Sequence, residues 1–207
     1  MPIYLFLLVI TCLVSYQAFN NPTLLNKLKH SPYLELRNKE YYRFITSGFV
    51  HGGWLHLGIN MFVLWEFGKM IEMMYVAHFG EIMGRINFVL LYLLTIIFAD
   101  IPTFLKHKNN PHYASVGASG AISGIVFVYI LFFPWQKIYL YGIVGIHSIF
   151  AGLAYLAYSS WASKNSRDNI DHEAHFYGAV FGFLFTIVLK PSLLQDFLSN
   201  LVNNFPF

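Results

Sequence analysis

Charged residues are scarce in this chain of 207 residues, making up 11% of it where an ordinary soluble domain has about a quarter. Hydrophobic residues make up 57%, and the mean hydropathy is +0.53. The net charge of +3 is spread over several loops, with no dense basic block of the kind that would indicate nucleic-acid binding. The shortage of charge therefore excludes an ordinary soluble domain and predicts a membrane protein.

Cysteine is almost absent as well. The single Cys12 excludes an internal disulfide, a paired-cysteine redox motif and a cysteine-based zinc site. The chain also lacks the H-E-x-x-H motif, and no carboxylate adjoins His51, His56 or His175, which argues against a zinc metalloprotease. We therefore predict no metal and no cofactor.

Long apolar stretches of spanning or near-spanning length recur six times. They lie at roughly residues 3–19, 54–76, 86–105, 117–133, 138–158 and 173–190. Because these runs are continuously apolar and do not alternate, they predict an all-α bundle of six transmembrane helices and not an outer-membrane barrel. The first run lacks a basic flank and a cleavage site, so we expect it to be retained.

The division of the chain follows from these runs. We predict one transmembrane domain over residues 1–190 and a short amphipathic tail over 191–207. The longest loop runs from about residue 20 to 53, and Asn21-Pro22 predicts an N-capped amphipathic helix at its start. The aromatic residues of this first loop indicate that it rests at the membrane interface.

Polar groups inside apolar runs are costly and are candidates for function. His56 and Asn60 lie four residues apart at the start of the second run, so one helical face presents both side chains. A satisfied interhelical hydrogen bond is the simpler explanation for such a pair taken alone. His51 lies five residues earlier, nearer the loop.

Gly117-Ala118-Ser119-Gly120 follows a polar loop and opens the fourth run, so it places a serine at the start of a helix. Backbone N–H groups in a first helical turn lack helical partners and can stabilise a developing oxyanion. For this tetrapeptide alone, a helix cap or a small packing residue is the plainer reading. The soluble-hydrolase motif G-x-S-x-G does not fit, because Ala121 stands where the last glycine would be.

His175 opens the sixth run beside a row of small residues. Ala174, Gly178 and Gly182 recur every four positions, and Gly120 and Gly124 show the same interval in the fourth run. Such faces let two membrane helices approach closely, as a serine–histidine hydrogen bond between helices requires. The alternative is a packing motif that carries an incidental histidine.

Taken in order, these elements resemble the rhomboid proteases over nearly the whole chain. The elements that carry the resemblance are His51, His56, Asn60, the Gly117–Gly120 tetrapeptide, and His175 with Gly178 and Gly182. Tyr42-Arg43 is similar to the family's Trp-Arg element in the first loop, with tyrosine in place of tryptophan.

The resemblance implies an intramembrane serine endopeptidase with Ser119 as nucleophile and His175 as general base. The backbone N–H of Ser119 and the side chains of His56 and Asn60 would hold the oxyanion, and His51 would support the first loop. The implied partners are transmembrane protein substrates and membrane lipids, and the implied location is a bacterial inner membrane, as a multi-pass protein. The alternatives are an inactive rhomboid-like protein that binds client helices and a small transporter.

Two features depart from the family pattern. Ser123 stands four residues after the nucleophile, where relatives often place an aromatic residue against the catalytic histidine. We therefore expect another aromatic residue, Tyr177 or Phe176, to cover the His175 ring. In addition, nine basic residues lie in the loops after the first, third and fifth runs and four on the opposite side. That count opposes the family orientation, with the site on the outer side, which we nevertheless expect.

Overall fold

Helices account for most of the chain, as the long apolar runs predict. The computed structural model describes residues 1–206 apart from 141–143, 167 and 169. The longer helices in this part are α1 (Ile3–Phe19), α5 (Trp54–Val63), α6 (Lys69–Phe79), α7 (Glu81–His107), α8 (Ser119–Phe132), α9 (Ser148–Asn165) and α10 (His172–Leu189). A π-helical turn, η2 (Leu64–Gly68), joins α5 to α6, so the second apolar run forms one continuous helical path.

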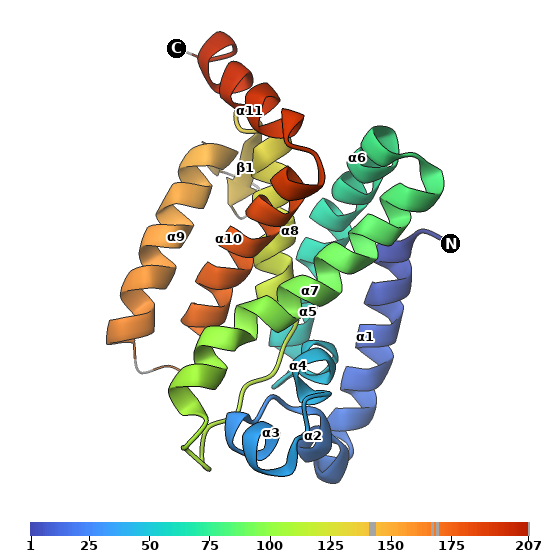
Figure 1. The fold of residues 1–207 in the computed structure, drawn as a ribbon, viewed down its shortest axis with the longest axis vertical. Coiled ribbons are helices and arrows are strands. Elements are labelled where there is room, and N and C mark those ends of the chain that lie inside the picture. The colour runs from blue at the N-terminus through green and yellow to red at the C-terminus, as the bar shows by residue number, and fades with distance from the viewer. Residues whose placement is uncertain (141–143, 167, 169, 207) are drawn as a thin grey trace.

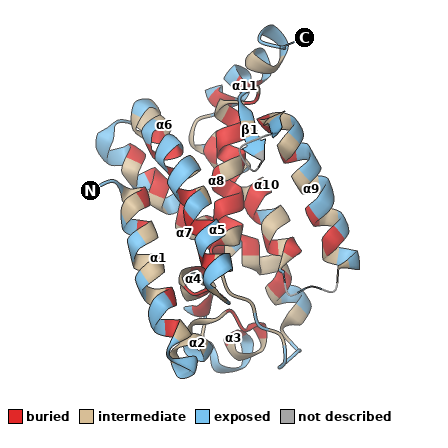
Figure 2. Ribbon diagram, turned by 180° about the vertical axis from the view of Figure 1, so that it is seen from behind, coloured by how far each residue is buried: buried red, intermediate tan, exposed pale blue. Residues whose placement is uncertain are grey.

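Helix α8 lies in the middle of the bundle, between α7 and α10 (Figures 1 and 2). Its sequence is apolar all round, which is the pattern of a buried helix. Ile125 and Val128 on this helix are completely buried, as are Phe88 and Leu91 on α7. The candidate nucleophile therefore begins the most enclosed helix of the described chain.

Two of the described helices, α7 and α10, are long and apolar enough to cross a membrane. Helices α1 and α8 are apolar but shorter. A helix rises about 1.5 Å per residue, so a 30 Å hydrocarbon core takes about 20 residues. The structure thus supports a helical protein with membrane-spanning candidates, and the full set of six spans remains a prediction.

The first loop is folded into short helices at one end of the bundle (Figure 1). These are α2 (Pro22–Leu28), α3 (Pro32–Asn38), α4 (Arg43–Thr46) and the 3₁₀ turn η1 (Ser47–Phe49). The predicted N-cap is present, since the Asn21 side chain accepts a hydrogen bond from the Leu24 N–H at 3.1 Å. The loop is thus an ordered part of the fold.

The prediction of a helix over 138–158 is wrong for residues 138–140 and 144–147, while 141–143 lie outside the described residues. The described residues there pair as antiparallel strands, β1 (Lys137–Leu140) and β2 (Val144–His147), in which Ile138 lies opposite Ile146. Helix α9 begins only after them, at Ser148. Hydropathy fixes the apolar character of a run but not its backbone, and the cross-strand hydrogen bonds of a hairpin satisfy the same polar groups as a helix.

The C-terminal tail contains the amphipathic helix that its spacing predicts, α11 (Ser192–Asn203). Leu193 and Phe197 are buried against Leu131 of α8, while Leu198 and Val202 are exposed. One apolar face of the helix therefore anchors the tail to the bundle.

Candidate active site

Helices α8 and α10 meet through glycine backbones. A Cβ atom built on Gly178 would collide with the carbonyl oxygen of Gly120, and one built on Gly182 would lie 2.5 Å from the Cα of Gly124. A Cβ on Gly120 would face the Ala174 carbonyl oxygen at 3.4 Å. The close approach that the four-residue spacing predicts is therefore present, and it is possible only because side chains are missing.

Ser119 and His175 flank this contact. Ser119 is the first residue of α8 and precedes Gly120, while His175 follows Ala174 in the first turn of α10. Both side chains are half-buried. No hydrogen bond joins the Ser119 hydroxyl to the His175 ring in the part of the chain described, and such bonds are often long in unliganded enzymes.

His51 is a buried support for the start of α8. Its Nε2 accepts a hydrogen bond from the Ala118 N–H at 3.4 Å, and its Nδ1 lies 2.9 Å from the Ser15 hydroxyl, which itself donates to the Phe49 carbonyl. Since that hydroxyl has one proton, His51 donates from Nδ1 and is neutral. Burial, aided by the nearby His56, lowers the pKa of His51 to about 3, consistent with that state.

His56 and Asn60 lie on α5, and the His56 ring faces the turn before the serine. Gly117 has a φ of 124°, and a Cβ there would lie 2.6 Å from Cε1 and 2.8 Å from Nε2 of His56. The glycine thus gives the His56 ring access to the backbone two residues before Ser119. Asn60 is buried, and its amide nitrogen donates to the His56 carbonyl at 2.8 Å, which leaves a second N–H available.

The first loop is tied to the segment that leads into Ser119. His30 and Ser115 exchange two backbone hydrogen bonds of 3.0 and 3.1 Å, and the Gly117 N–H donates to the Ser47 carbonyl at 3.0 Å. Ser47 also donates to Asp100 of α7 at 3.4 Å. The loop therefore fixes the backbone on which the serine stands.

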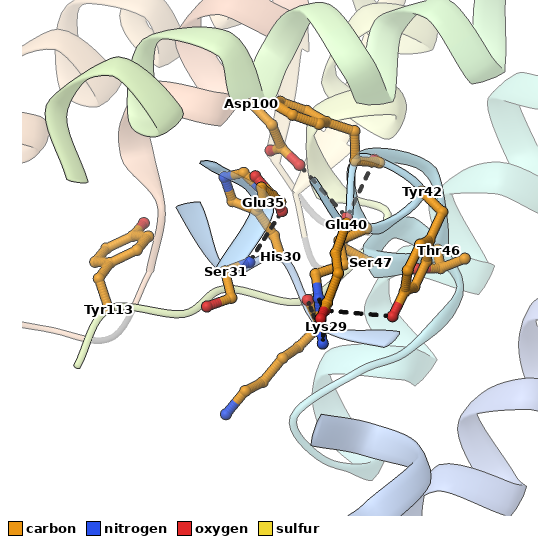
Figure 3. A network of polar contacts seen from close by, with 12 residues as sticks. Lys29, His30, Ser31, Glu35, Glu40, Tyr42, Thr46, Ser47, Asp100 and Tyr113 are labelled. Carbon is orange, nitrogen blue, oxygen red and sulfur yellow. Dashed lines mark hydrogen bonds and ion pairs between the residues drawn. The ribbon is translucent and has the colours of Figure 1, made fainter. Parts of the chain in front are cut away.

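Polar side chains hold this loop together (Figure 3). Arg43 is buried and donates to Glu40 at 2.6 Å and to the carbonyl oxygens of Asn26 and Lys29 at 2.8 and 3.0 Å. Beside it, His30 and Glu35 form a fully buried pair at 2.7 Å. These contacts of Arg43 all lie within the first loop, so Arg43 stabilises the loop.

Asp171 positions the start of α10. Its carboxylate accepts hydrogen bonds from the Ala174 N–H at 2.9 Å, from Thr103 at 3.1 Å and from the Tyr113 hydroxyl at 2.9 Å. It is therefore the N-cap of the helix that carries His175, and it also links that helix to α7. The adjacent anion is one reason, after burial, that the pKa of Tyr113 is raised.

The aromatic residue beside His175 is neither Tyr177 nor Phe176. Tyr177 is 44% exposed, and Phe176 packs edge-on against it. Instead, Tyr155 of α9 lies nearly parallel to the His175 ring, with 6.2 Å between centroids and 22° between planes, and the His172 ring meets the His175 ring edge-on at 5.9 Å. Sequence spacing carries no signal for the Tyr155 contact, because it joins two helices whose relative rotation only packing determines.

A model of the rhomboid domain family matches residues 38–192. The curated relatives that align with the chain include a rhomboid-like protein 11 of the Arabidopsis thaliana chloroplast (32% identical over 176 residues, 80% of this chain and 59% of the relative). They also include rhomboid protein 1 of the Saccharomyces cerevisiae mitochondrion (34%, 47% and 27%) and the rhomboid protease GluP of Bacillus subtilis (36%, 41% and 14%).

These relatives inform two properties of the protein: its location and the share of the relatives' length that it covers. Two of them are organellar, so the comparisons support an integral membrane protein without singling out the bacterial inner membrane that the sequence predicts. The chain spans 59% of the length of the Arabidopsis relative and smaller shares of the other two.

Proposed function

This chain belongs to the rhomboid family, and from that premise we propose that it is an intramembrane serine endopeptidase whose Ser119–His175 dyad cleaves transmembrane protein substrates. The observation that carries the proposal is the glycine-to-backbone contact of α8 and α10, which brings the first turns of both helices together. The substrates, lipid partners and six-span topology are part of the proposal.

In the proposed first step, His175 takes the hydroxyl proton of Ser119 as the oxygen attacks the scissile carbonyl. The tetrahedral oxyanion would be held by the Ser119 N–H, which has no helical partner in the first turn of α8, and by His56 and Asn60. His51 supports this step indirectly, because its bond to the Ala118 N–H orients the peptide next to Ser119.

The second step releases the amine and regenerates the serine. Protonated His175 gives its proton to the leaving nitrogen, and an acyl ester on Ser119 remains. His175 then takes a proton from water, which attacks the ester, and the hydroxyl of Ser119 is restored as the acid product leaves. A dyad suffices because Asp171 and the α10 backbone hold the histidine helix without a third catalytic residue.

The alternative is a rhomboid-like protein that binds client helices without cleaving them. The lack of a Ser119–His175 hydrogen bond among the described residues is the observation in its favour. Such a protein would bind a transmembrane peptide but would not react with a serine-directed reagent.

One experiment tests both. The purified wild type and Ser119→Ala are incubated with a transmembrane peptide that has small residues near one end, with and without a chelator, and in parallel with a fluorophosphonate. We expect cleavage and labelling of the wild type, loss of both in Ser119→Ala, and no effect of the chelator. Cleavage by Ser119→Ala would sink the dyad, and an unlabelled wild type that binds the peptide would favour the inactive alternative.

A further inference from the structure

Tyr155 of α9 contacts His175 directly and is linked to Ser119 through Ser123. Its ring lies alongside His175 on α10, and its hydroxyl is 2.6 Å from the hydroxyl of Ser123 on α8. Ser123 in turn donates to the carbonyl oxygen of Ser119 at 2.8 Å. One side chain from a third helix therefore connects the histidine ring to the backbone of the nucleophile.

The direction of these hydrogen bonds follows from the number of protons. A serine hydroxyl has one, and Ser123 gives its proton to the Ser119 carbonyl. The Tyr155 hydroxyl must then donate to Ser123, which accepts through a lone pair. The tyrosine is thereby fixed at its tip, which restricts the ring to one place beside His175.

The small side chain of Ser123 makes this arrangement possible. Ser123 is buried, and a bulky residue at this position would occupy the space that the Tyr155 hydroxyl enters. Phe127, one turn further along α8, packs against the same ring with 6.1 Å between centroids. The ring beside His175 is thus supplied from α9, where a residue four positions after the serine would supply it from α8.

We propose that Tyr155 is the positioning residue for His175, held beside the ring by its hydrogen bond to Ser123. This inference rests on the proposed serine protease function. Helix α9 stands at the edge of the bundle beside α10 (Figure 1), and the Tyr155 ring is not part of the backbone contact between α8 and α10. Loss of the Tyr155 ring would therefore weaken catalysis and leave Ser119 and His175 in place.

The test compares variants by the rate of fluorophosphonate labelling and by kcat and KM for a transmembrane peptide. An aromatic pair contributes about 0.5 to 1.5 kcal/mol, so Tyr155→Leu should lower kcat and the labelling rate by about 2- to 13-fold with little change in KM. Tyr155→Phe keeps the ring but loses the hydrogen bond to Ser123, so it should label more slowly than the wild type and faster than Tyr155→Leu. Thermal unfolding in detergent confirms that each variant is folded.

Phe150→Leu is the matched control, since Phe150 lies on the same helix but its ring contacts Trp135 and His147, away from the candidate site. It should label at the wild-type rate. Wild-type labelling by Tyr155→Leu, or an equal loss in Phe150→Leu, would overturn the inference. An unlabelled wild type would refute the protease function itself, which is a different outcome.

A second measurement decides the matter if Tyr155→Leu does not fold. Tyr155→Phe and Ser123→Ala each remove the same hydrogen bond, so the double variant should be no slower than the slower single variant. Losses that multiply in the double variant, or two single variants at the full wild-type rate, would show that the hydroxyl pair does not position the site.

Discussion

At the candidate site, helix α8 contacts α10 and α9 in opposite ways. Towards α10 it presents Gly120 and Gly124, and the two backbones touch with no side chain between them. Towards α9 it presents Ser123 and Phe127, and the contact is made by side chains. The distance between α8 and α10 is set by backbone atoms already in contact, so it cannot shorten. The distance between α8 and α9 depends on side chains, which can change rotamer.

The two contacts of α8 therefore have different roles at the site. The backbone contact fixes the distance between the helices that carry Ser119 and His175, and packed cores of this kind resist continuous deformation. The side-chain contact governs only the surroundings of the His175 ring. Changes to the first contact should therefore have the larger effects.

Gly178→Ala tests the contrast most severely. The new methyl group would collide with the Gly120 carbonyl, so α10 must move away from α8. Overpacking of this kind costs about 1 to 3 kcal/mol of stability, and a displacement of about 1 Å at a reacting group costs about 10²-fold in rate. Thermal unfolding and fluorophosphonate labelling measure the two effects.

The matched substitution at the contact of α8 with α9 is Gly152→Ala. The atom nearest to the new Cβ would be the tip of the Ile130 side chain, at 2.5 Å. That tip can rotate, so we expect labelling within about threefold of the wild type. Gly58→Ala, with nothing within 4 Å of the new atom, should be silent. Equal losses of labelling rate in Gly178→Ala and Gly152→Ala would show that the two helix contacts do not differ in their effect on the site.

Gly117→Ala extends the comparison to α5, where the atoms that face the glycine belong to a side-chain ring and not to a backbone. The methyl group would meet the His56 ring, and the φ of 124° is strained for any residue but glycine. Displacing His56, one of the proposed oxyanion donors, should lower kcat by about 10- to 100-fold, less than its complete removal. His56→Ala provides the reference: if Gly117→Ala were additive with it, the two residues would not act together.

The parts of this site that the sequence predicts are those that local chemistry determines. The serine at a helix start follows from a polar loop that ends at Gly117–Gly120, and the close helix pair follows from glycines every four residues. Asn21 caps its helix for the same local reason. Such features need no knowledge of how the helices are rotated about their axes.

The parts that the sequence does not predict depend on relative rotation and on chain direction. Tyr155 has no distinguishing neighbours in the sequence, and only the packing of α9 turns it towards His175. The hairpin at Ile138 and Ile146 escapes prediction because its strands continue the apolar run of α9. Hydropathy likewise cannot show that Ser47 and Gly117, 70 residues apart, share a backbone hydrogen bond.

The smallest expected effect concerns the first loop, where His30 and Glu35 form a buried ion pair. Burial opposes the charge on His30, but the hydrogen bond to Glu35 and the charges of Asp100, Glu35 and Asp171 outweigh it and raise the His30 pKa above 6.5. The stabilisation is therefore fully present below pH 6.5 and is lost as the pH rises through the higher folded-state pKa.

Thermal unfolding of the wild type in detergent should accordingly shift to lower temperature as the pH rises above 6.5, and Glu35→Gln should flatten this dependence. Glu40→Gln is the control, because hydrogen bonds from Asn38 and Arg43 lower the Glu40 pKa. Its contribution is present above pH 4.5 and disappears only in acid, so this variant should keep the alkaline slope. If Glu35→Gln retained the slope, the loop would be held by its Arg43 contacts and not by the His30–Glu35 pair, and the pH dependence would arise elsewhere in the bundle.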